Sequence, residues 1–388
     1  MNKQMYLYIN ACSDLGSRMN MIAVSALLFT HENSAFWLMA YFVARQVGAL
    51  LSSLYAGMLA DRWDRRRLMM ASDVLCGLSI GLVAVFPYPL VAVLAAFFVG
   101  MLYNVFQISF DASLPQLFGE GNVYATNSKV VRLGMLASLL GFMVGGFLAD
   151  QVGSRYLIAF DAFTFILSAT FLSRLRWNSA PVKAGAKPEW LTDLRIVASY
   201  LKDRPLYSYL LGIGFLYAFA STSWNYGLPL LSQTMGNVQS TMHGMMWTTI
   251  VAGGFFGSYL LGKVRFALIP ALLVSMSLFA LLISFAFWGS GPVVTLVMLF
   301  VAGCVDAQTQ MAQRTLMQGS ANHLRGRILG STALLARIGF LLGFSVEPFL
   351  IQQFSLEGMV LAIQGAVLMS LLLLAVPMLR SARQTLPE

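Results

Sequence analysis

Apolar runs of about 20 residues recur along the whole chain, and they limit its fold more than any other feature of the sequence. An α-helix needs about 20 apolar residues to cross the ~30 Å hydrocarbon core of a bilayer, whereas a transmembrane β-strand needs only ~10 residues of alternating polarity. The runs are longer than such a strand and apolar on every side. Charged residues make up only 11% of the chain, against about 25% in soluble domains. The sequence therefore predicts a polytopic α-helical membrane protein.

Twelve segments are predicted to be membrane-spanning helices. Most connections between them are short, but residues 176–204 are polar and split the chain into six spans plus six. We therefore predict an all-α membrane protein of two six-helix bundles, residues 1–175 and 205–388, joined by a cytoplasmic linker loop at 176–204. The predicted spans are 6–30, 36–60, 68–86, 89–112, 124–149, 155–175, 205–231, 243–262, 266–288, 292–313, 326–353 and 357–379.

The basic residues are unevenly distributed between the two ends of the predicted spans. The chain has 25 Lys and Arg residues and a net charge of +9. With the N-terminus in the cytoplasm, most of them fall in cytoplasmic loops, and the outer loops contain one, Arg155. Cytoplasmic loops of membrane proteins carry an excess of Lys and Arg. We therefore predict a multi-pass protein of the inner (cytoplasmic) membrane with both termini in the cytoplasm, and the charge requires no nucleic-acid partner.

The chain lacks the residue patterns of a catalytic or metal centre. Its three cysteines (Cys12, Cys76 and Cys304) lie inside apolar runs without CxxC spacing, and its three histidines are not paired at metal-ligand spacing. It has no GxSxG sequence, no Walker loop and no sizeable soluble domain. These observations argue against an enzyme and predict neither a metal nor a cofactor.

The two halves of the chain resemble each other in parallel. Matching residues recur in the same order with a slowly increasing offset, which supports a duplicated six-helix unit. Because six spans per half is an even number, both halves keep the same orientation. This predicts a pseudo-two-fold axis along the membrane normal and a site between the halves near the midplane. The matched positions are Gly57 and Arg65 with Gly257 and Arg265, Asn104 with Asp306, and Arg132 with Arg337.

A recognisable motif lies between the second and third predicted spans, where residues 57–69 read Gly-Met-Leu-Ala-Asp-Arg-Trp-Asp-Arg-Arg-Arg-Leu-Met. This stretch resembles the G-x-L-a-D-r-x-x-r-k-x-x-l signature of the major facilitator superfamily, which carries it in the same loop. With the twelve predicted spans, the resemblance covers essentially the whole chain. It implies a secondary active transporter that works by alternating access in the lipid bilayer, and we expect a monomer.

Other stretches resemble the macrolide-efflux and siderophore-exporter branch of that superfamily. The branch implies a proton-coupled exporter of a small organic molecule, either a siderophore or an amphiphilic drug, and hence an antiporter. Span four lacks the Arg-x-x-Gln-Gly motif of other proton-coupled drug antiporters, so the usual carrier of coupling is missing. The branch stretches are residues 60–67 with Asp73, 114–117, 158–161 and 324–328.

The signature residues are predicted to form a gate on the cytoplasmic side. Asp61 ends span two, and a carboxylate there can pair with a nearby basic group or a helix N-terminus. Gly57 lets two helices approach closely. Such pairs would hold the bundles together in one state and break in the other, although a plain positive-inside loop explains Arg66 equally well. The predicted gate residues are Gly57, Asp61, Arg62, Arg65 and Arg66.

Two carboxylates inside the spans are predicted to carry protons. An ionisable residue in a transmembrane helix costs about 2.5–3.5 kcal/mol on insertion scales, so it is a functional candidate by default. Asp14 lies in span one with Arg18 at i, i+4 on the same helical face, and Asp306 lies in span ten. A proton and a cationic partner would compete for such a carboxylate, as an antiporter requires. The alternative is that each carboxylate belongs to a structural ion pair.

Polar residues in the cavity-lining spans are predicted to bind substrate. In the superfamily that this chain resembles, spans one, four, seven and ten line the cavity. Arginines within the spans favour an anionic or carboxylate-bearing molecule such as a siderophore, whereas the branch resemblance equally allows a neutral or cationic macrolide-like drug. The predicted substrate-binding residues are Arg18, Arg45, Tyr103, Asn104, Gln107, Trp224, Asn225 and Gln310.

Other polar and small residues in the spans are predicted to be structural. Gly141, Gly145 and Gly146 in span five form a pattern that is typical of close helix packing. The charged structural residues are Asp73 and Asp161, which would hold helices together, and Arg132 and Arg337, which would pair with groups such as Asp111 or Glu347.

Two other functions stay open at this point. A lysophospholipid flippase is the alternative within the transporter class. A transporter-like receptor would bind a ligand and signal through the 176–204 loop without moving the ligand across the membrane. A channel is less consistent with a duplicated six-plus-six bundle, which points to alternating access.

Overall fold

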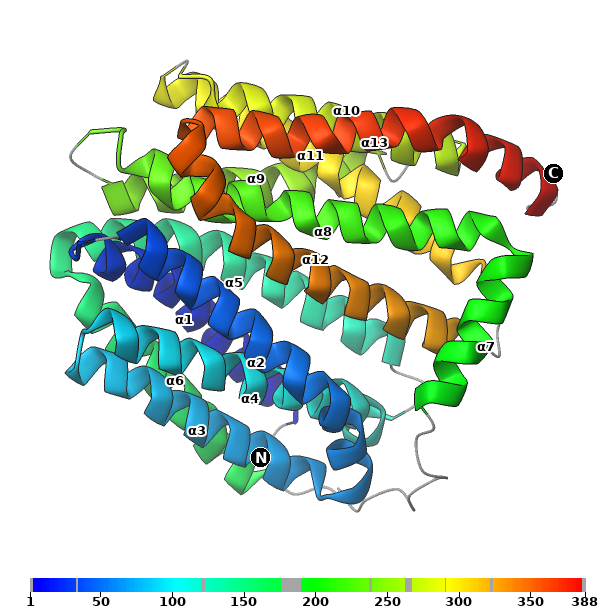
Figure 1. Cartoon of the computed structure of the whole chain (residues 1–388). Helices are drawn as coiled ribbons and strands as arrows, with labels where there is room; N and C mark the ends of the chain where they lie inside the picture. Colours follow the sequence, from blue (N-terminus) through cyan, green and yellow to red (C-terminus); the bar gives the residue numbers. More distant parts are fainter. Residues whose placement is uncertain are drawn as a thin grey trace. The chain divides into compact units, whose positions relative to one another are not determined.

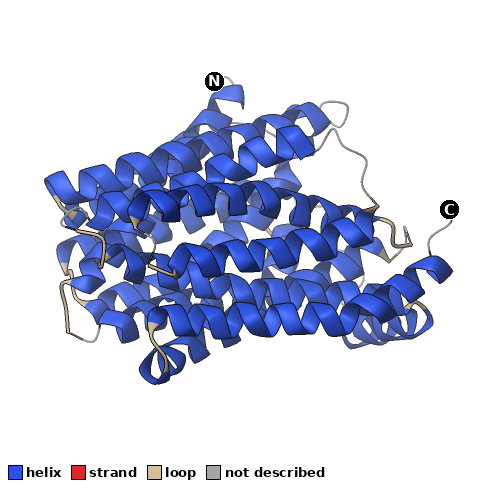
Figure 2. Ribbon diagram, turned by 90° about the horizontal axis from the view of Figure 1, so that it is seen from above, coloured by secondary structure: helices blue, strands red, loops and turns tan. Residues whose placement is uncertain are grey.

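The computed structural model describes residues 3–32, 34–119, 123–175, 190–236, 239–261, 267–289, 291–321 and 324–385. Within these ranges the regular secondary structure is helical, as Figure 2 shows, and no strand occurs. The helices run from α1 to α13 in chain order (Figure 1). The prediction of an all-α fold is therefore confirmed.

Each of the twelve predicted spans overlaps one long helix. The additional helix, α7, lies within the predicted linker, so residues 190–203 are helical rather than a loop, and residues 176–189 lie outside the described part of the chain. The helices are α1 Lys3–Phe29, α2 Ser34–Arg62, α3 Arg65–Val85, α4 Pro89–Phe118, α5 Val123–Val152, α6 Ser154–Arg174, α7 Trp190–Asp203, α8 Pro205–Ser232, α9 Gln239–Leu261, α10 Leu268–Phe287, α11 Pro292–Gln318, α12 Arg325–Gln353 and α13 Leu356–Thr385.

Nine helices in the described ranges are long and apolar enough to cross a membrane. Three other long helices, α1, α8 and α9, are not among these nine. α1 contains Asp14 and Arg18, and α8 contains Asn225 among several Ser and Thr residues. The chain is therefore a multi-pass membrane protein, and the exact number of twelve spans stays a prediction.

Two compact units can be distinguished in the chain. The first consists of residues 1–188 with 232–248, and the second of residues 189–231 with 249–388. The first unit thus contains α1 to α6 and the beginning of α9. The second contains α7, α8 up to Leu231, the rest of α9, and α10 to α13. The predicted bundle boundaries at residues 175 and 205 stay a prediction.

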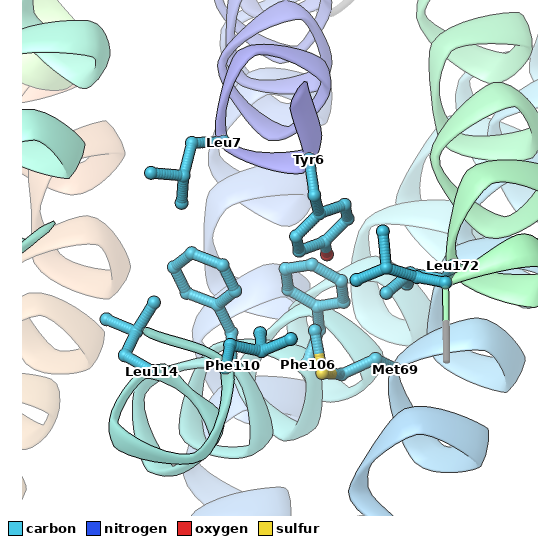
Figure 3. Packing of buried hydrophobic residues seen from close by; sticks show 9 residues of the cluster. Tyr6, Leu7, Met69, Phe106, Phe110, Leu114 and Leu172 are labelled. Atoms are coloured by element: carbon cyan, nitrogen blue, oxygen red, sulfur yellow. The ribbon is translucent and has the colours of Figure 1, made fainter. Parts of the chain in front are cut away.

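The core of the first unit includes an aromatic and aliphatic cluster from α1, α3, α4 and the end of α6 (Figure 3). Tyr6 meets Phe110 edge to face, with ring centroids 6.0 Å apart, and Phe110 stacks on Phe106, also at 6.0 Å. Because lipid tails are as apolar as these side chains, the cluster stabilises the unit through close packing rather than through removal of water. Its members are Tyr6, Leu7, Met69, Phe106, Phe110, Leu114, Leu117, Leu172 and Leu175.

α2 and α4 approach each other at two glycines. A Cβ built on Gly48 would lie 2.1 Å from the carbonyl oxygen of Phe97, and one built on Gly100 would lie 2.1 Å from the carbonyl oxygen of Arg45. No side chain fits at such a distance from the backbone of a neighbouring helix. These two glycines therefore fix how closely α2 and α4 pack.

The same approach recurs in the second unit between α9 and α11. A Cβ on Gly253 would lie 2.1 Å from the carbonyl oxygen of Phe300, and one on Gly303 would lie 2.2 Å from that of Ile250. α9 and α11 are the second and fourth long helices of the second half, as α2 and α4 are of the first. The recurrence supports the predicted duplication.

Candidate functional site

Asp14 lies on α1 and is contacted by a tyrosine from α4. The Tyr103 hydroxyl donates to Oδ1 of Asp14 at 3.3 Å. Arg18, one turn further along α1, lies within electrostatic range of this carboxylate. Its guanidinium group sits over the Phe142 ring, 5.6 Å from the ring centroid. A carboxylate flanked by a donor and a cation in this way can exchange a proton for either partner.

Asp306 of α11 is held by two donors in the second unit. Tyr217 of α8 donates its hydroxyl to Oδ1 at 2.6 Å, and Gln310, one turn along α11, donates from Nε2 to Oδ2 at 2.7 Å. Both bonds are of normal length, which is about 2.5–3.0 Å for an oxygen donor and about 2.7–3.2 Å for a nitrogen donor, so both carboxylate oxygens are well bonded. The structure thus places Gln310, a predicted substrate-binding residue, in direct contact with a predicted proton carrier.

The two halves of the chain carry their tyrosine–aspartate pairs in opposite order. In the first half, the acid Asp14 is on the first long helix and the phenol Tyr103 on the fourth. In the second half, the phenol Tyr217 is on the first long helix and the acid Asp306 on the fourth. Each unit therefore joins its two predicted cavity-lining helices with one phenol–carboxylate bond.

Two further predicted substrate-binding residues lie near Tyr103. Arg45 of α2 lies within electrostatic range of Tyr103 and of Asp161. Asn104 is buried, and its Nδ2 donates to Oγ of Ser52 at 2.9 Å. The amide of Asn104 therefore links α4 to α2, which is a structural use of a residue that was predicted to bind substrate.

The remaining predicted substrate-binding residues have mixed surroundings. Trp224 of α8 is buried and meets Phe279 of α10 edge to face, with ring centroids 6.2 Å apart. Asn225 donates from Nδ2 to the carbonyl oxygen of Ser221 in its own helix at 2.7 Å, which leaves its amide oxygen available as an acceptor. Gln107 is half-buried on α4.

Asp161 and Asp73 are buried carboxylates of the first unit. Asp161 accepts a hydrogen bond from Oγ of Ser17 at 3.2 Å, which joins α6 to α1 as the structural prediction requires. The absence of a side chain at Gly16 leaves space for this contact, because a Cβ there would lie 2.9 Å from Oδ1 of Asp161. The Oδ2 atoms of Asp73 and Asp161 are buried without a hydrogen-bond partner among the described residues.

Arg65 of the signature motif binds backbone carbonyls. It is buried at the start of α3, where Nε donates to the carbonyl oxygen of Ala60 at 3.0 Å and Nη1 to that of Ala112 at 2.7 Å. Ala60 lies in the last turn of α2, where carbonyl groups have no partner in their own helix. Arg65 therefore ties α3 to the end of α2 and to α4.

Arg66 binds the end of another helix. Its Nε donates to the carbonyl oxygen of Leu172 at 2.8 Å, and its Nη2 donates to that of Ser173. Both acceptors lie in the last turn of α6, where a cation is also favoured by the helix dipole. Arg66 thus caps α6, so the two motif arginines have a structural use within the first unit.

The other motif residues make fewer contacts among the described residues. Asp64 caps the start of α3 by accepting from the backbone N–H of Arg67 at 3.1 Å. Arg62 is exposed at the end of α2. A Cβ on Gly57 would meet no described atom within 4 Å, and the side chain of Asp61 lies outside the description. The predicted latch through Gly57 and Asp61 therefore stays a prediction.

The predicted partners of two arginines are wrong. Arg132 hydrogen-bonds Ser128 of its own helix, from Nη2 to Oγ at 3.2 Å and from Nε to the carbonyl oxygen at 3.3 Å, rather than pairing with Asp111. Neither carboxylate oxygen of Glu347 accepts a hydrogen bond from a described residue, so Arg337 is not its hydrogen-bond partner.

Two glycines of α5 confirm the predicted close packing. A Cβ on Gly141 would lie 2.7 Å from Cβ of Arg18, and one on Gly145 would lie 2.7 Å from Cα of Met19. Both contacts are with α1. The turn of α1 that carries Arg18 is therefore packed directly against the glycines of α5.

Asp150 is a contact residue that sequence reasoning missed. Within the first unit, its Oδ1 accepts from the backbone N–H of Ser240 at 3.1 Å, and its Oδ2 accepts from the backbone N–H and hydroxyl of Thr241 at 2.8 and 2.7 Å. A Cβ on Gly146 would lie 2.5 Å from the carbonyl oxygen of Ser240. The free N–H groups at the start of α9 attract a carboxylate. A lone acid at the end of a predicted span is no signal of such a contact.

Comparison with known proteins gives a family match. A family model described as Major Facilitator Superfamily matches residues 7–344. The enterobactin exporter EntS of Escherichia coli O1:K1 / APEC is 26% identical over 387 residues, covering 95% of this chain and 89% of that protein. The bacilysin exporter BacE of Bacillus subtilis (strain 168) is 22% identical over 343 residues, covering 84% and 83%.

Solved structures show the same fold. The nucleoside transporter NupG matches with a TM-score of 0.77 at 15% identity and covers 98% of this chain and 99% of its own. A D-xylose–proton symporter matches with a TM-score of 0.72 at 14% identity and covers 95% and 96%. At these identities the likeness establishes the architecture and carries no argument about the substrate.

Proposed function

This chain belongs to the major facilitator superfamily of membrane transporters, and on that premise we propose that it is a proton-coupled exporter of a small organic molecule. The molecule is a siderophore or an amphiphilic drug, and the transporter works by alternating access as a monomer. The observation that carries the proposal is the phenol–carboxylate pair in each unit, Tyr103 with Asp14 and Tyr217 with Asp306.

Export as the direction of transport is supported by the relatives. EntS and BacE are both named exporters, and EntS aligns with almost the whole of this chain. The superfamily as a whole moves solutes in either direction, so the direction comes from these relatives and not from the fold. Siderophore export is the more specific version of the proposal, because EntS is named for enterobactin.

Proton coupling through Asp14 and Asp306 is supported by their surroundings. Each acid bonds a tyrosine on the partner cavity-lining helix of its own unit. Protonation of either acid removes an acceptor with full negative charge and weakens the bond that joins the two helices. Proton binding would therefore change how tightly α1 holds α4 and how tightly α8 holds α11. A helix contact that depends on protonation is what a coupled transporter requires.

An anionic substrate is supported by arginines on α1 and α2. Arg18 is exposed, and its guanidinium lies over the Phe142 ring, which orients the cation without neutralising it. Arg45 lies one helix away, near Tyr103. Together they would offer a positively charged and aromatic surface to a carboxylate- or catecholate-bearing molecule. Tyr103, Gln107, Trp224, Asn225 and Gln310 would add polar and aromatic contacts.

A cytoplasmic position of both termini is supported by the distribution of arginines between the two ends of the first unit. Arg66 bonds the end of α6, so the basic loop after α2 and the basic residue Arg174 lie at the same end of the first unit. Arg155 at the start of α6 donates to the carbonyl oxygen of Ala84 near the end of α3, at the other end of these helices. The excess of positive charge at one end would place that end in the cytoplasm of an inner-membrane protein.

Transport into inside-out membrane vesicles tests the proposal. Vesicles that contain the protein should accumulate a labelled catecholate siderophore when their lumen is made acidic, and vesicles without the protein should not. Collapse of the pH gradient with a protonophore should abolish accumulation. Accumulation that survives the protonophore would rule out proton coupling. Specific binding with neither accumulation nor counterflow would indicate a receptor, and movement of labelled lysophospholipid alone would indicate a flippase.

A further inference from the structure

Glu347 is a buried acid that neither the proposed proton site nor the substrate site uses. It lies on α12 and is 0% exposed. The side chain faces α8, where Thr222 and Tyr226 lie beside it. Tyr226 is also 0% exposed. The acid is therefore enclosed within the second unit between two helices.

Neither oxygen of Glu347 accepts a hydrogen bond from any residue in the described ranges. The Thr222 hydroxyl has a single proton, which it donates to the carbonyl oxygen of Phe219 at 2.6 Å. Gln364 of α13 is likewise occupied, because its Nε2 donates to Oγ of Ser223 at 2.9 Å. The polar groups near this part of α8 are therefore not arranged to stabilise a carboxylate.

The charged surroundings of Glu347 are equally sparse. Tyr226 of α8 is a titratable group within electrostatic range of it. Within the described ranges, no side chain of α11 or α13 donates a hydrogen bond to either carboxylate oxygen of Glu347. Arg337 lies ten residues earlier on the same helix, about 15 Å along the axis. An ionised Glu347 would thus be a buried charge without a cation beside it, and the neighbouring hydroxyl of Thr222 already donates its proton to Phe219.

An unpaired ionised carboxylate in a low-dielectric interior is so costly that such a group takes up a proton instead. As a neutral acid, Glu347 gains one O–H donor, and the Thr222 oxygen still has lone pairs to accept it. The packing at this point is tight, because a Cβ on Gly343 would lie 2.2 Å from Oγ1 of Thr222. Glu347 and Thr222 therefore fit each other when the acid holds its proton.

The fold does not require an acid at this position. The repeat register that matches Arg132 with Arg337 places Phe142 opposite Glu347. Phe142 is 2% exposed in the first unit, so an apolar side chain fills the equivalent place there. Glu347 is thus a polar residue at a position where the equivalent helix of the first unit packs with an apolar side chain.

We propose that Glu347 is a proton-binding site of the second unit, loaded in this conformation and released only when water enters between α8 and α12. The inference rests on the proposed proton-coupled transport and adds a third acid to Asp14 and Asp306. Glu347 differs from those two, because it lacks a partner that could replace the proton. Its proton can therefore leave only when the helices around it move or become hydrated.

Infrared spectroscopy of the purified protein tests the bound proton without any transport assay. The difference spectrum between wild type and Glu347→Gln, at mildly alkaline pH, should contain the carbonyl band of a neutral carboxylic acid. Glu347→Met is the second variant, because an unbranched apolar side chain fills a similar volume even if Gln does not fold. Glu357→Gln, at the start of α13, is the matched control and should lack the band. A difference spectrum with only carboxylate bands would overturn the proposal.

Transport in proteoliposomes tests the use of the proton. In Glu347→Gln, accumulation of labelled siderophore driven by a pH gradient should fall about tenfold or more relative to substrate exchange without a gradient. In Glu357→Gln the ratio should match wild type. A wild-type ratio in Glu347→Gln would overturn the coupling role. If wild type itself ignores the pH gradient, the proposed function fails, while the infrared result still decides whether Glu347 binds a proton.

Discussion

Tyr217 and Asp306 form a hydrogen bond of 2.6 Å between α8 and α11, whereas Tyr103 and Asp14, the corresponding pair of the first half, are 3.3 Å apart. The first distance is that of a strong hydrogen bond to a carboxylate, and the second is longer than a typical one. Asp306 also has a second donor, Gln310, at 2.7 Å. The two predicted proton carriers are therefore held with unequal strength.

This inequality predicts a difference between two conservative variants. Tyr217→Phe removes the short bond and should destabilise the protein by about 1–2 kcal/mol, because a half-buried carboxylate loses a donor. Tyr103→Phe should cost less than about 1 kcal/mol, because the bond it removes is long. Thermal unfolding of both purified variants in the same detergent measures the difference. Equal losses, or a larger loss for Tyr103→Phe, would contradict the geometry.

The motif arginines should differ according to what they bind. Arg65 donates to two backbone carbonyls from a buried position, so Arg65→Ala leaves buried acceptors unpaired and should cost about 2–4 kcal/mol. Arg67 is exposed, and only its backbone N–H takes part in the cap of α3, so Arg67→Ala should cost less than about 0.5 kcal/mol. Thermal unfolding in detergent compares them. A pure charge effect on topology would instead affect both variants alike.

The glycine contact between α9 and α11 should not tolerate a methyl group. In Gly303→Ala the new Cβ would lie 2.2 Å from the carbonyl oxygen of Ile250, so the helices must move apart. We expect strongly reduced yield of folded protein, measured by fluorescence-detected size-exclusion chromatography. Gly365→Ala is the control, because a Cβ there meets no described atom within 4 Å, and it should behave as wild type. Normal behaviour of Gly303→Ala would show that α9 and α11 have room for a methyl group at this contact.

In the predicted division into two bundles, α5 belongs to the first bundle and α9 to the second, so the contact of Asp150 with Thr241 should open during transport if access alternates. Asp150 and Thr241 approach to 2.7 Å through their side chains, so cysteines at both positions are close enough to be cross-linked. In a background without the three native cysteines, the oxidised pair should not transport, and a reductant should restore transport. Each single cysteine variant, treated with oxidant, is the control. Full transport by the cross-linked pair would mean that this contact is permanent.

Most of the architecture was predictable from the sequence, because the constraint of the bilayer acts on long segments. Twenty apolar residues in a row specify a helix whatever their neighbours are, so each predicted span overlaps a long helix. α7 was not predicted, because residues 190–203 mix apolar and charged side chains and are too polar to cross a membrane. The glycine contacts at Gly100 and Gly303 were not predicted either, since they depend on which face meets another helix.

The sequence allowed the candidate site residues to be predicted, but not the residues to which they bond. Asp14 and Asp306 stand out because charges inside spans are rare, yet their bonds to Tyr103 and Tyr217 join residues far apart in the chain. The sequence suggests Glu347 as a partner for an arginine such as Arg337, because it gives no information on which side chains are buried. Burial and the absence of hydrogen bonds to it in the described ranges change that interpretation.

The central claim is that Asp14 and Asp306 link proton movement to export. It is tested most directly by measuring siderophore accumulation and lumenal pH together in proteoliposomes that contain wild type, Asp14→Asn or Asp306→Asn. We expect wild type to move protons against substrate, and at least one variant to lose proton-driven accumulation by about tenfold or more. Both variants should remain folded, as judged by size-exclusion chromatography. Unchanged pH dependence and unchanged proton movement in both variants would contradict the claim.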